Sequence, residues 1–159
     1  MQIFASGNLD EYKLRDLIEG DAPIDGFGVG TRLDTSSDAP YLDCAYKLQE
    51  YAGCPCRKRS EGKTTWPGQK QVYRVFDAEG YIDGDVLTVC DDRQEGQPLL
   101  VPVLRGGKRV DGPEAISVLR DRAARQLRTL PRRLCVLEGQ REPFEVTISE
   151  ALQRARAHG

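Results

Sequence analysis

The chain has 159 residues, of which 39% are hydrophobic and 30% are charged, and its formal net charge is −2. This composition is typical of a folded domain rather than a disordered segment, and the near-neutral charge gives no signal for nucleic-acid binding. No apolar run of about 18 residues and no signal-peptide pattern occurs in the sequence. We therefore expect no membrane association and a cytoplasmic location.

Two glycine-containing turns stand near the start of the chain. Ser6-Gly7-Asn8 follows the apolar run 3–5, and a second turn through Gly28, Gly30 and Thr31 follows the apolar run 24–27. A strand that ends in glycine and small polar residues leaves backbone N–H groups free, and glycine lets phosphate oxygens approach closely. The two turns together predict a phosphate-binding cradle, although similar turns also occur where nothing binds.

A helix is predicted between the two turns. Asn8 is the expected N-cap, Glu11 its capping-box partner, and Gly20 the expected end. The resulting order of strand, helix and strand favours a parallel pair, whose carboxyl ends lie at one edge. No long amphipathic helix is expected after Thr31, and the second turn lacks the spacing of a P-loop.

The middle of the chain favours short strands. We expect strands at 44–51, 71–76 and 86–90, with a turn at 77–80 that pairs the last two in a small antiparallel sheet. Trp66, in the loop between the first two strands, is expected to be exposed and able to pack on a neighbouring domain.

Helices are predicted near the end of the chain. Apolar residues repeat at helical spacing from Pro113 to Leu130, with arginines mostly on the other faces. Those arginines are interpreted as a solvated face rather than as a phosphate or RNA contact. A shorter last helix is expected through Arg156, capped by Thr147 or Ser149.

The charges are unevenly distributed along the sequence. Residues 1–50 contain ten acidic and four basic side chains, whereas residues 54–74 contain six basic and one acidic. The basic stretch either attracts a polyanionic substrate or protects a sheet edge, and the sequence favours neither. The side chains concerned are Arg57, Lys58, Arg59, Lys63 and Lys70.

Cysteine and histidine give weaker signals. Five cysteines in a chain without an export signal argue against a disulfide framework. Cys54-Pro55-Cys56 lacks the spacing of a zinc site and has no second pair, so we interpret it as thiols without a metal. His158 is the only histidine, and its place next to the end argues against a catalytic role.

Several short sequence motifs, taken in order, resemble the carboxyl-terminal part of nicotinate phosphoribosyltransferase, the family that makes nicotinate mononucleotide for NAD biosynthesis. They extend from the first residues to about Arg74, with a looser likeness beyond it. The matching motifs are Ala5-Ser6-Gly7-Asn8-Leu9-Asp10-Glu11-Tyr12, Phe27-Gly28-Val29-Gly30-Thr31, Tyr46-Lys47-Leu48, Lys58-Arg59-Ser60-Glu61-Gly62-Lys63 and Pro67-Gly68-Gln69-Lys70.

The resemblance implies an α/β fold of two parts. Residues 1–33 would supply the last strands of an irregular type II phosphoribosyltransferase (β/α) barrel, and residues 34–159 would return to a mixed, largely antiparallel α/β layer of the smaller domain. The family's phosphate-binding turns fall on two groups of positions. The substrate-binding residues that this implies are Ser6, Gly7, Asn8, Gly28, Gly30 and Thr31.

The resemblance also implies the reaction and its participants. Nicotinate and 5-phosphoribosyl-1-diphosphate would be the substrates, ATP and Mg²⁺ the cofactors, and a homodimer the assembly. A complete barrel takes about 250 residues, so we expect this chain to be part of the enzyme. The family's phosphorylated histidine would lie in the missing amino-terminal part, and the fragment alone is expected to be inactive.

Two alternatives remain open at this point. One is a barrel-type phosphoribosyltransferase that acts on nicotinamide or quinolinate, because the residues that select the base lie outside the chain. The other is a non-enzymatic phosphate-binding or assembly module.

Overall fold

The computed structural model describes residues 1–37, 39–41, 44–58, 60, 64–138 and 143–158. The chain divides into two compact units, Met1–Tyr46 and Lys47–Gly159, and each is described by itself. The division after residue 33, which concerns the assembled enzyme, stays a prediction.

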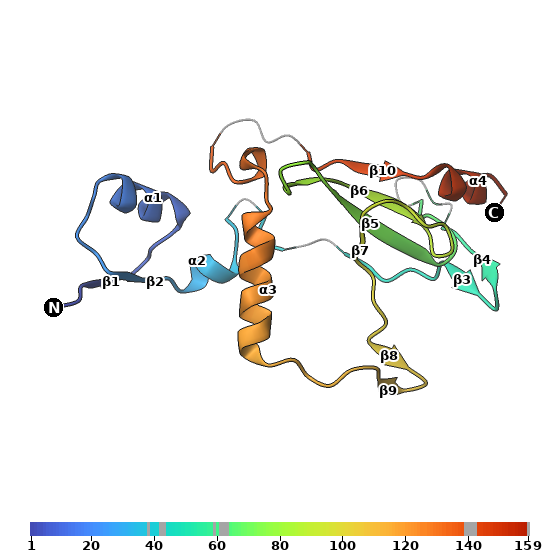
Figure 1. Ribbon diagram of the computed structural model, residues 1–159, viewed down its shortest axis with the longest axis horizontal. Helices are drawn as coiled ribbons and strands as arrows, with labels where there is room; N and C mark the ends of the chain where they lie inside the picture. Colours follow the sequence, from blue (N-terminus) through green and yellow to red (C-terminus); the bar gives the residue numbers. More distant parts are fainter. Residues whose placement is uncertain (38, 42–43, 59, 61–63, 139–142, 159) are drawn as a thin grey trace. The chain divides into compact units, whose positions relative to one another are not determined.

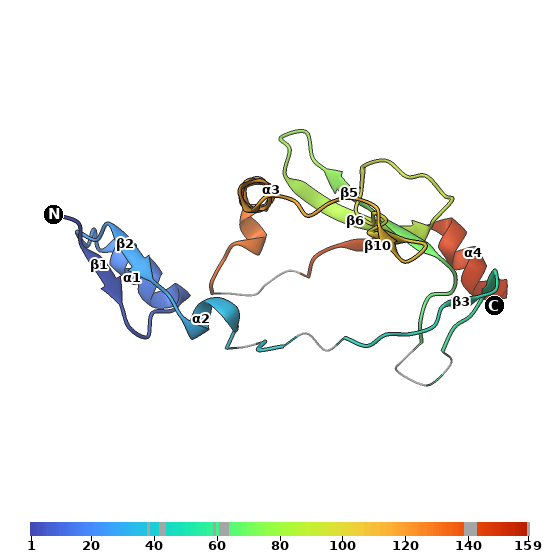
Figure 2. The ribbon, with the colours of Figure 1, turned by 90° about the horizontal axis from the view of Figure 1, so that it is seen from below.

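The first unit is built around two short parallel strands (Figures 1 and 2). Its elements are β1 (Phe4–Ser6), α1 (Glu11–Glu19), β2 (Gly26–Gly28) and α2 (Thr31–Asp34). β1 and β2 pair in parallel, with Phe4 opposite Gly26 and Ser6 opposite Gly28. The predicted strand, helix and parallel strand are confirmed, and the helix after Gly30 has only four residues.

The start of α1 differs from the prediction. Asp10, not Asn8, is the N-cap, and its side chain accepts a hydrogen bond from the Lys13 N–H at 2.9 Å. Asn8 has a left-handed backbone, with φ +52°, and therefore still belongs to the turn. Gly20 ends the helix as predicted, and its N–H donates to the Asp16 carbonyl at 3.0 Å.

The second unit contains a four-stranded sheet in the order β10-β6-β5-β7 (Figure 1). Its strands are β5 (Lys70–Phe76), β6 (Ile82–Val89), β7 (Gln97–Pro98) and β10 (Val146–Ile148). β5 is antiparallel to both β6 and β7, whereas β10 runs parallel to β6. The predicted hairpin across residues 77–80 is confirmed, and the layer is mixed and largely antiparallel.

Two small hairpins are separate from this sheet, one before β5 in the sequence and the other between β7 and β10. They are formed by β3 (Glu50–Tyr51) with β4 (Cys54–Pro55), and by β8 (Leu104–Arg105) with β9 (Lys108–Arg109). The strand predicted over 44–51 is wrong for all but its last two residues. Apolar composition alone could not show that 44–48 lacks a pairing partner among the described residues.

Two longer helices complete the second unit. α3 (Ile116–Arg128) begins three residues after the predicted start, because Ala115 is still extended and serves as the N-cap. The short 3-10 helix η1 (Arg132–Leu134) follows. α4 (Glu150–His158) closes the chain. Ser149 caps α4, since its hydroxyl accepts the Leu152 N–H at 3.1 Å, so the second of the two predicted caps is confirmed.

Few side chains are fully buried. Among the described residues, the buried hydrophobic ones are Leu9, Ile82 and Leu152. β6 carries the centre of the second unit, because Ile82, Asp85 and Thr88 on this strand are all buried. Asp85 is held by two 2.9 Å hydrogen bonds from the Arg74 guanidinium on β5. None of the described helices is long and apolar enough to cross a membrane.

Candidate phosphate-binding site

The parallel pairing of β1 and β2 brings the two predicted turns to one edge of the strand pair. Ser6 and Gly28 are partners at the last position of the ladder. A Cβ on Gly28 would lie 3.1 Å from the Ser6 Cβ, which is closer than side chains normally pack. Glycine at this position therefore keeps the two strand ends together.

The backbone of both turns is open. Gly7 has φ +106° and Asn8 has φ +52°, so the chain reverses sharply after β1. A Cβ placed on Gly7 or Gly30 would meet no heavy atom of the described residues within 4 Å. The main chain at these two glycines is thus accessible to a ligand that approaches closely.

A pocket of about 640 Å³ lies at this edge, entirely within the first unit. This volume is in the range of small-molecule sites. Five of the six predicted site residues line it, whereas Ser6 does not. The lining residues are Gly7, Asn8, Leu9, Gly28, Gly30, Thr31, Arg32 and Thr35.

Hydrogen bonds fix the loops around the pocket. The Lys13 ammonium donates to the Asn8 carbonyl at 2.7 Å, which ties the first turn to α1. The Asp25 carboxylate accepts the Ile3 N–H at 2.6 Å and joins the starts of the two strands. The first contact fixes the turn at Asn8, and the second fixes the starts of the two strands.

Sequence reasoning missed three of the lining residues. Leu9 is buried, and Thr35 donates its hydroxyl proton to the Thr31 carbonyl at 2.9 Å. Arg32 is the third of these lining residues. Its position directly after Thr31 was the available signal, but a charged residue there is equally typical of solvent exposure.

No family model matches the sequence. The nicotinate phosphoribosyltransferase pncB2 of Mycobacterium tuberculosis is 40% identical to this chain over 153 residues, which are 96% of the chain and 33% of the relative. The nicotinate phosphoribosyltransferase of Caenorhabditis elegans is 38% identical over 100 residues, covering 62% of the chain and 18% of the relative.

The chain is a relative of the nicotinate phosphoribosyltransferases. The resemblance seen in the sequence is thereby confirmed over almost the whole chain. The crystal structure of human nicotinic acid phosphoribosyltransferase has the same fold over 99% of this chain and 33% of its own, with a TM-score of 0.78 and 21% identity. The chain spans about a third of the length of the first relatives that it matches.

Local contacts account for one side chain of the basic stretch, residues 54–74. The Lys70 ammonium donates to the Trp66 carbonyl at 2.9 Å and to the Gly68 carbonyl at 2.5 Å. Burial lowers the pKa of Lys70, and the Glu50 carboxylate opposes that shift. Lys70 is thus engaged with main-chain carbonyls. Arg59 and Lys63 lie outside the described residues, and the role of the other basic side chains stays a prediction.

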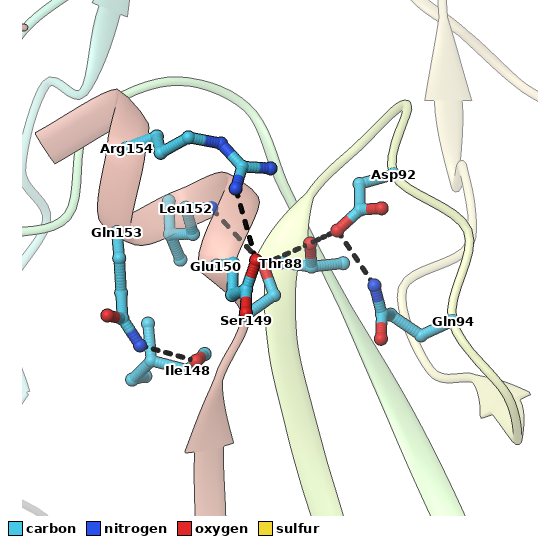
Figure 3. A network of polar contacts seen from close by, with 9 residues as sticks. All are labelled: Thr88, Asp92, Gln94, Ile148, Ser149, Glu150, Leu152, Gln153 and Arg154. Atoms are coloured by element: carbon cyan, nitrogen blue, oxygen red, sulfur yellow. Dashed lines mark hydrogen bonds and ion pairs between the residues drawn. The ribbon is translucent and has the colours of Figure 1, made fainter.

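A polar network surrounds the start of α4 in the second unit (Figure 3). The Thr88 hydroxyl donates to the Asp92 carboxylate at 2.5 Å and lies 2.7 Å from the Ser149 hydroxyl. Because the single Thr88 proton goes to Asp92, Ser149 donates in the second bond. The Thr88 hydrogen bond lowers the pKa of Asp92, with further help from Gln94. Ser149 also accepts the Leu152 N–H at 3.1 Å, so the network joins the start of α4 to β6.

Trp66 is not exposed, contrary to the prediction. Its side chain is half-buried, and the Arg156 guanidinium on α4 lies 4.7 Å from the ring centroid. Cation–π attraction of this kind stabilises the docking of the helix. Trp66 therefore packs within its own unit.

The five cysteines are all free thiols, and only Cys56 is half-buried. Among the described residues, no group of three histidine, cysteine or acidic side chains is placed to hold a metal ion. α4 continues to His158, the histidine for which the sequence predicted no catalytic role.

Proposed function

We propose that this chain is the carboxyl-terminal segment of an ATP-dependent nicotinate phosphoribosyltransferase. The assembled enzyme would join nicotinate to 5-phosphoribosyl-1-diphosphate, form nicotinate mononucleotide and release diphosphate. The chain's relatives carry the name of this activity, which favours nicotinate over nicotinamide or quinolinate as the base. The missing amino-terminal part and a second copy of the enzyme are the proposed partners.

The observation that carries this proposal is the meeting of the two glycine turns at one pocket. Gly7 and Gly30 present unobstructed backbone on its walls. Backbone N–H groups of this kind bind the oxygens of a phosphate. The role proposed for this segment is to hold the ribose 5-phosphate, with Ser6 supporting the first turn from the adjacent strand end.

The (β/α) barrel is part of the same proposal. β1 and β2 are parallel and are joined through a helix, which is the repeating unit of such a barrel. In barrels the ligand lies at the carboxyl ends of the strands, and phosphate commonly lies beside the last two. The position of the pocket agrees with β1 and β2 as those last strands.

The described residues that line this pocket do not fit a Mg²⁺ site. Mg²⁺ prefers carboxylate and other oxygen ligands, and the pocket lining contains no carboxylate. The ATP-coupled histidine of the family would have to come from the part of the enzyme that this chain does not contain. What this segment contributes is orientation of the phosphoribosyl donor, which by itself accounts for much of the catalysis in such transfers.

The proposal is tested with a chimera in which this chain replaces the matching third of the Mycobacterium tuberculosis relative. We expect the chimera to form nicotinate mononucleotide from nicotinate and the phosphoribosyl donor. The same assay on the isolated chain is expected to give no product, because the chain spans only a third of its relatives.

The parent enzyme is the positive control in this assay. A folded chimera without turnover, measured beside an active parent, contradicts the proposed function. Product formation by the isolated chain would show that the catalytic groups have been misplaced.

A further inference from the structure

The first unit is strongly acidic, and only one of its basic side chains lacks a partner in the described residues. Residues 1–46 contain nine acidic side chains and three basic ones. Lys13 bonds to the Asn8 carbonyl and lies 4.0 Å from the Asp10 carboxylate, and Arg15 forms a 3.1 Å ion pair with Asp16. For Arg32, the described part of the structure provides neither a hydrogen bond nor an ion pair.

Arg32 is also the only charged residue in the pocket lining that the structure describes. The neighbouring Thr35 hydroxyl has already given its proton to the Thr31 carbonyl, so it has no proton left for a ligand. A net charge of −6 over residues 1–46 opposes the approach of an anion. The positive charge of Arg32, a lining residue of the pocket, counters that repulsion locally.

We propose that Arg32 is the specificity-determining residue through which this pocket selects a phosphate monoester over an uncharged sugar. This inference rests on the proposed function and adds to it a side chain that the glycine turns do not include. Backbone N–H groups bind phosphate oxygens and neutral hydroxyls alike, whereas a planar guanidinium makes paired, charge-assisted hydrogen bonds to a phosphate.

Direct binding to the full chain tests the inference, with ribose 5-phosphate and ribose as the probes in isothermal titration calorimetry. We expect wild type to bind ribose 5-phosphate and not ribose. Arg32→Gln should raise the Kd for ribose 5-phosphate by about tenfold or more, the change expected when a hydrogen bond to a charged group is lost. Arg32→Lys should restore part of the affinity because it keeps the charge.

Arg15→Gln is the matched control, since it removes one positive charge from the same unit outside the pocket lining. It should leave the Kd unchanged, and circular dichroism should show that all variants remain folded. Equal affinity of wild type and Arg32→Gln, or no binding of ribose 5-phosphate by wild type, overturns the inference.

The outcomes separate this inference from the proposed function. If Gly30→Val abolishes binding of ribose 5-phosphate and Arg32→Gln does not, the phosphate cradle stands and the role of Arg32 is rejected. Turnover by the chimera is measured independently of both variants, so the enzymatic proposal survives or fails by its own assay.

Discussion

Gly96 lies directly against the main chain of Arg74. A Cβ on Gly96 would overlap the Arg74 carbonyl oxygen, and the φ of Gly96 is +106°. Gly96 comes immediately before β7, where Gln97 pairs with Arg74. Gly80 also has a positive φ, +87°, but a Cβ there would meet no heavy atom of the described chain within 4 Å.

Replacing each of these two glycines by alanine distinguishes the cost of backbone strain from the cost of a steric clash. Gly80→Ala should cost about 1–2 kcal/mol, the strain of a left-handed conformation. Gly96→Ala should cost clearly more, because the Arg74 carbonyl must also move. Urea denaturation of both variants measures the difference in the free energy of unfolding. Equal losses of stability would mean that β7 moves to accommodate the added methyl group at no cost.

Gly30→Val is predicted to weaken donor binding without unfolding the protein. The space around Gly30 is open, so the added side chain meets no neighbouring atom of the described chain and occupies the proposed phosphate position. In the chimera, KM for the phosphoribosyl donor should rise about tenfold or more while kcat changes little. Gly112→Val, at another glycine whose Cβ position is open among the described residues, is the control. Equal KM values for the two variants would exclude Gly30 from the donor site.

Ser149→Ala should destabilise the attachment of α4. It removes the N-cap acceptor and the hydrogen bond to Thr88, and the loss of such a cap costs about 0.5–2 kcal/mol. Thr147→Ala is the control, because Thr147 was the other residue predicted as the cap. It should leave the melting temperature almost unchanged, since Thr147 is exposed. The same loss in both variants would contradict the capping role of Ser149.

The stability contributed by Asp92 should depend on pH. Its pKa is lowered in the folded chain by the Thr88 hydrogen bond, so the folded state favours the ionised carboxylate. The contribution is therefore complete above the ordinary aspartate pKa of about 3.9. It disappears as the pH falls through the lower, folded value.

Melting temperatures of wild type and Asp92→Asn at several pH values test this dependence. Wild type should be more stable near pH 7, and the difference should shrink below about pH 4. A difference that grows toward acid pH would mean that the carboxylate is destabilised in the folded state.

The sequence correctly predicted helix ends and turns that depend on residues close together in the chain. Gly20 ends α1, Ser149 caps α4, and the turn at 77–80 joins β5 to β6, each through residues that lie within a few positions of one another. Pairing over long distances could not be predicted in this way. β10 joins β6 about 60 residues away along the chain, and nothing in residues 44–48 shows that they lack a strand partner in the described structure.

The residues of the candidate site also differ in how far the sequence could predict them. The glycines that bare the main chain were recognisable from spacing alone, because few other residues allow those turns. Arg32 was not, because its significance depends on Lys13 and Arg15 being engaged with other groups. That information exists only once the side chains are placed.

The contact between Trp66 and Arg156 gives the chain a built-in optical reporter. Trp66 is the only tryptophan, and its ring lies under a guanidinium carried by α4. Detachment of that helix would expose the indole to water and shift its fluorescence emission to longer wavelength. Intrinsic fluorescence therefore follows the docking of the last helix without an added label.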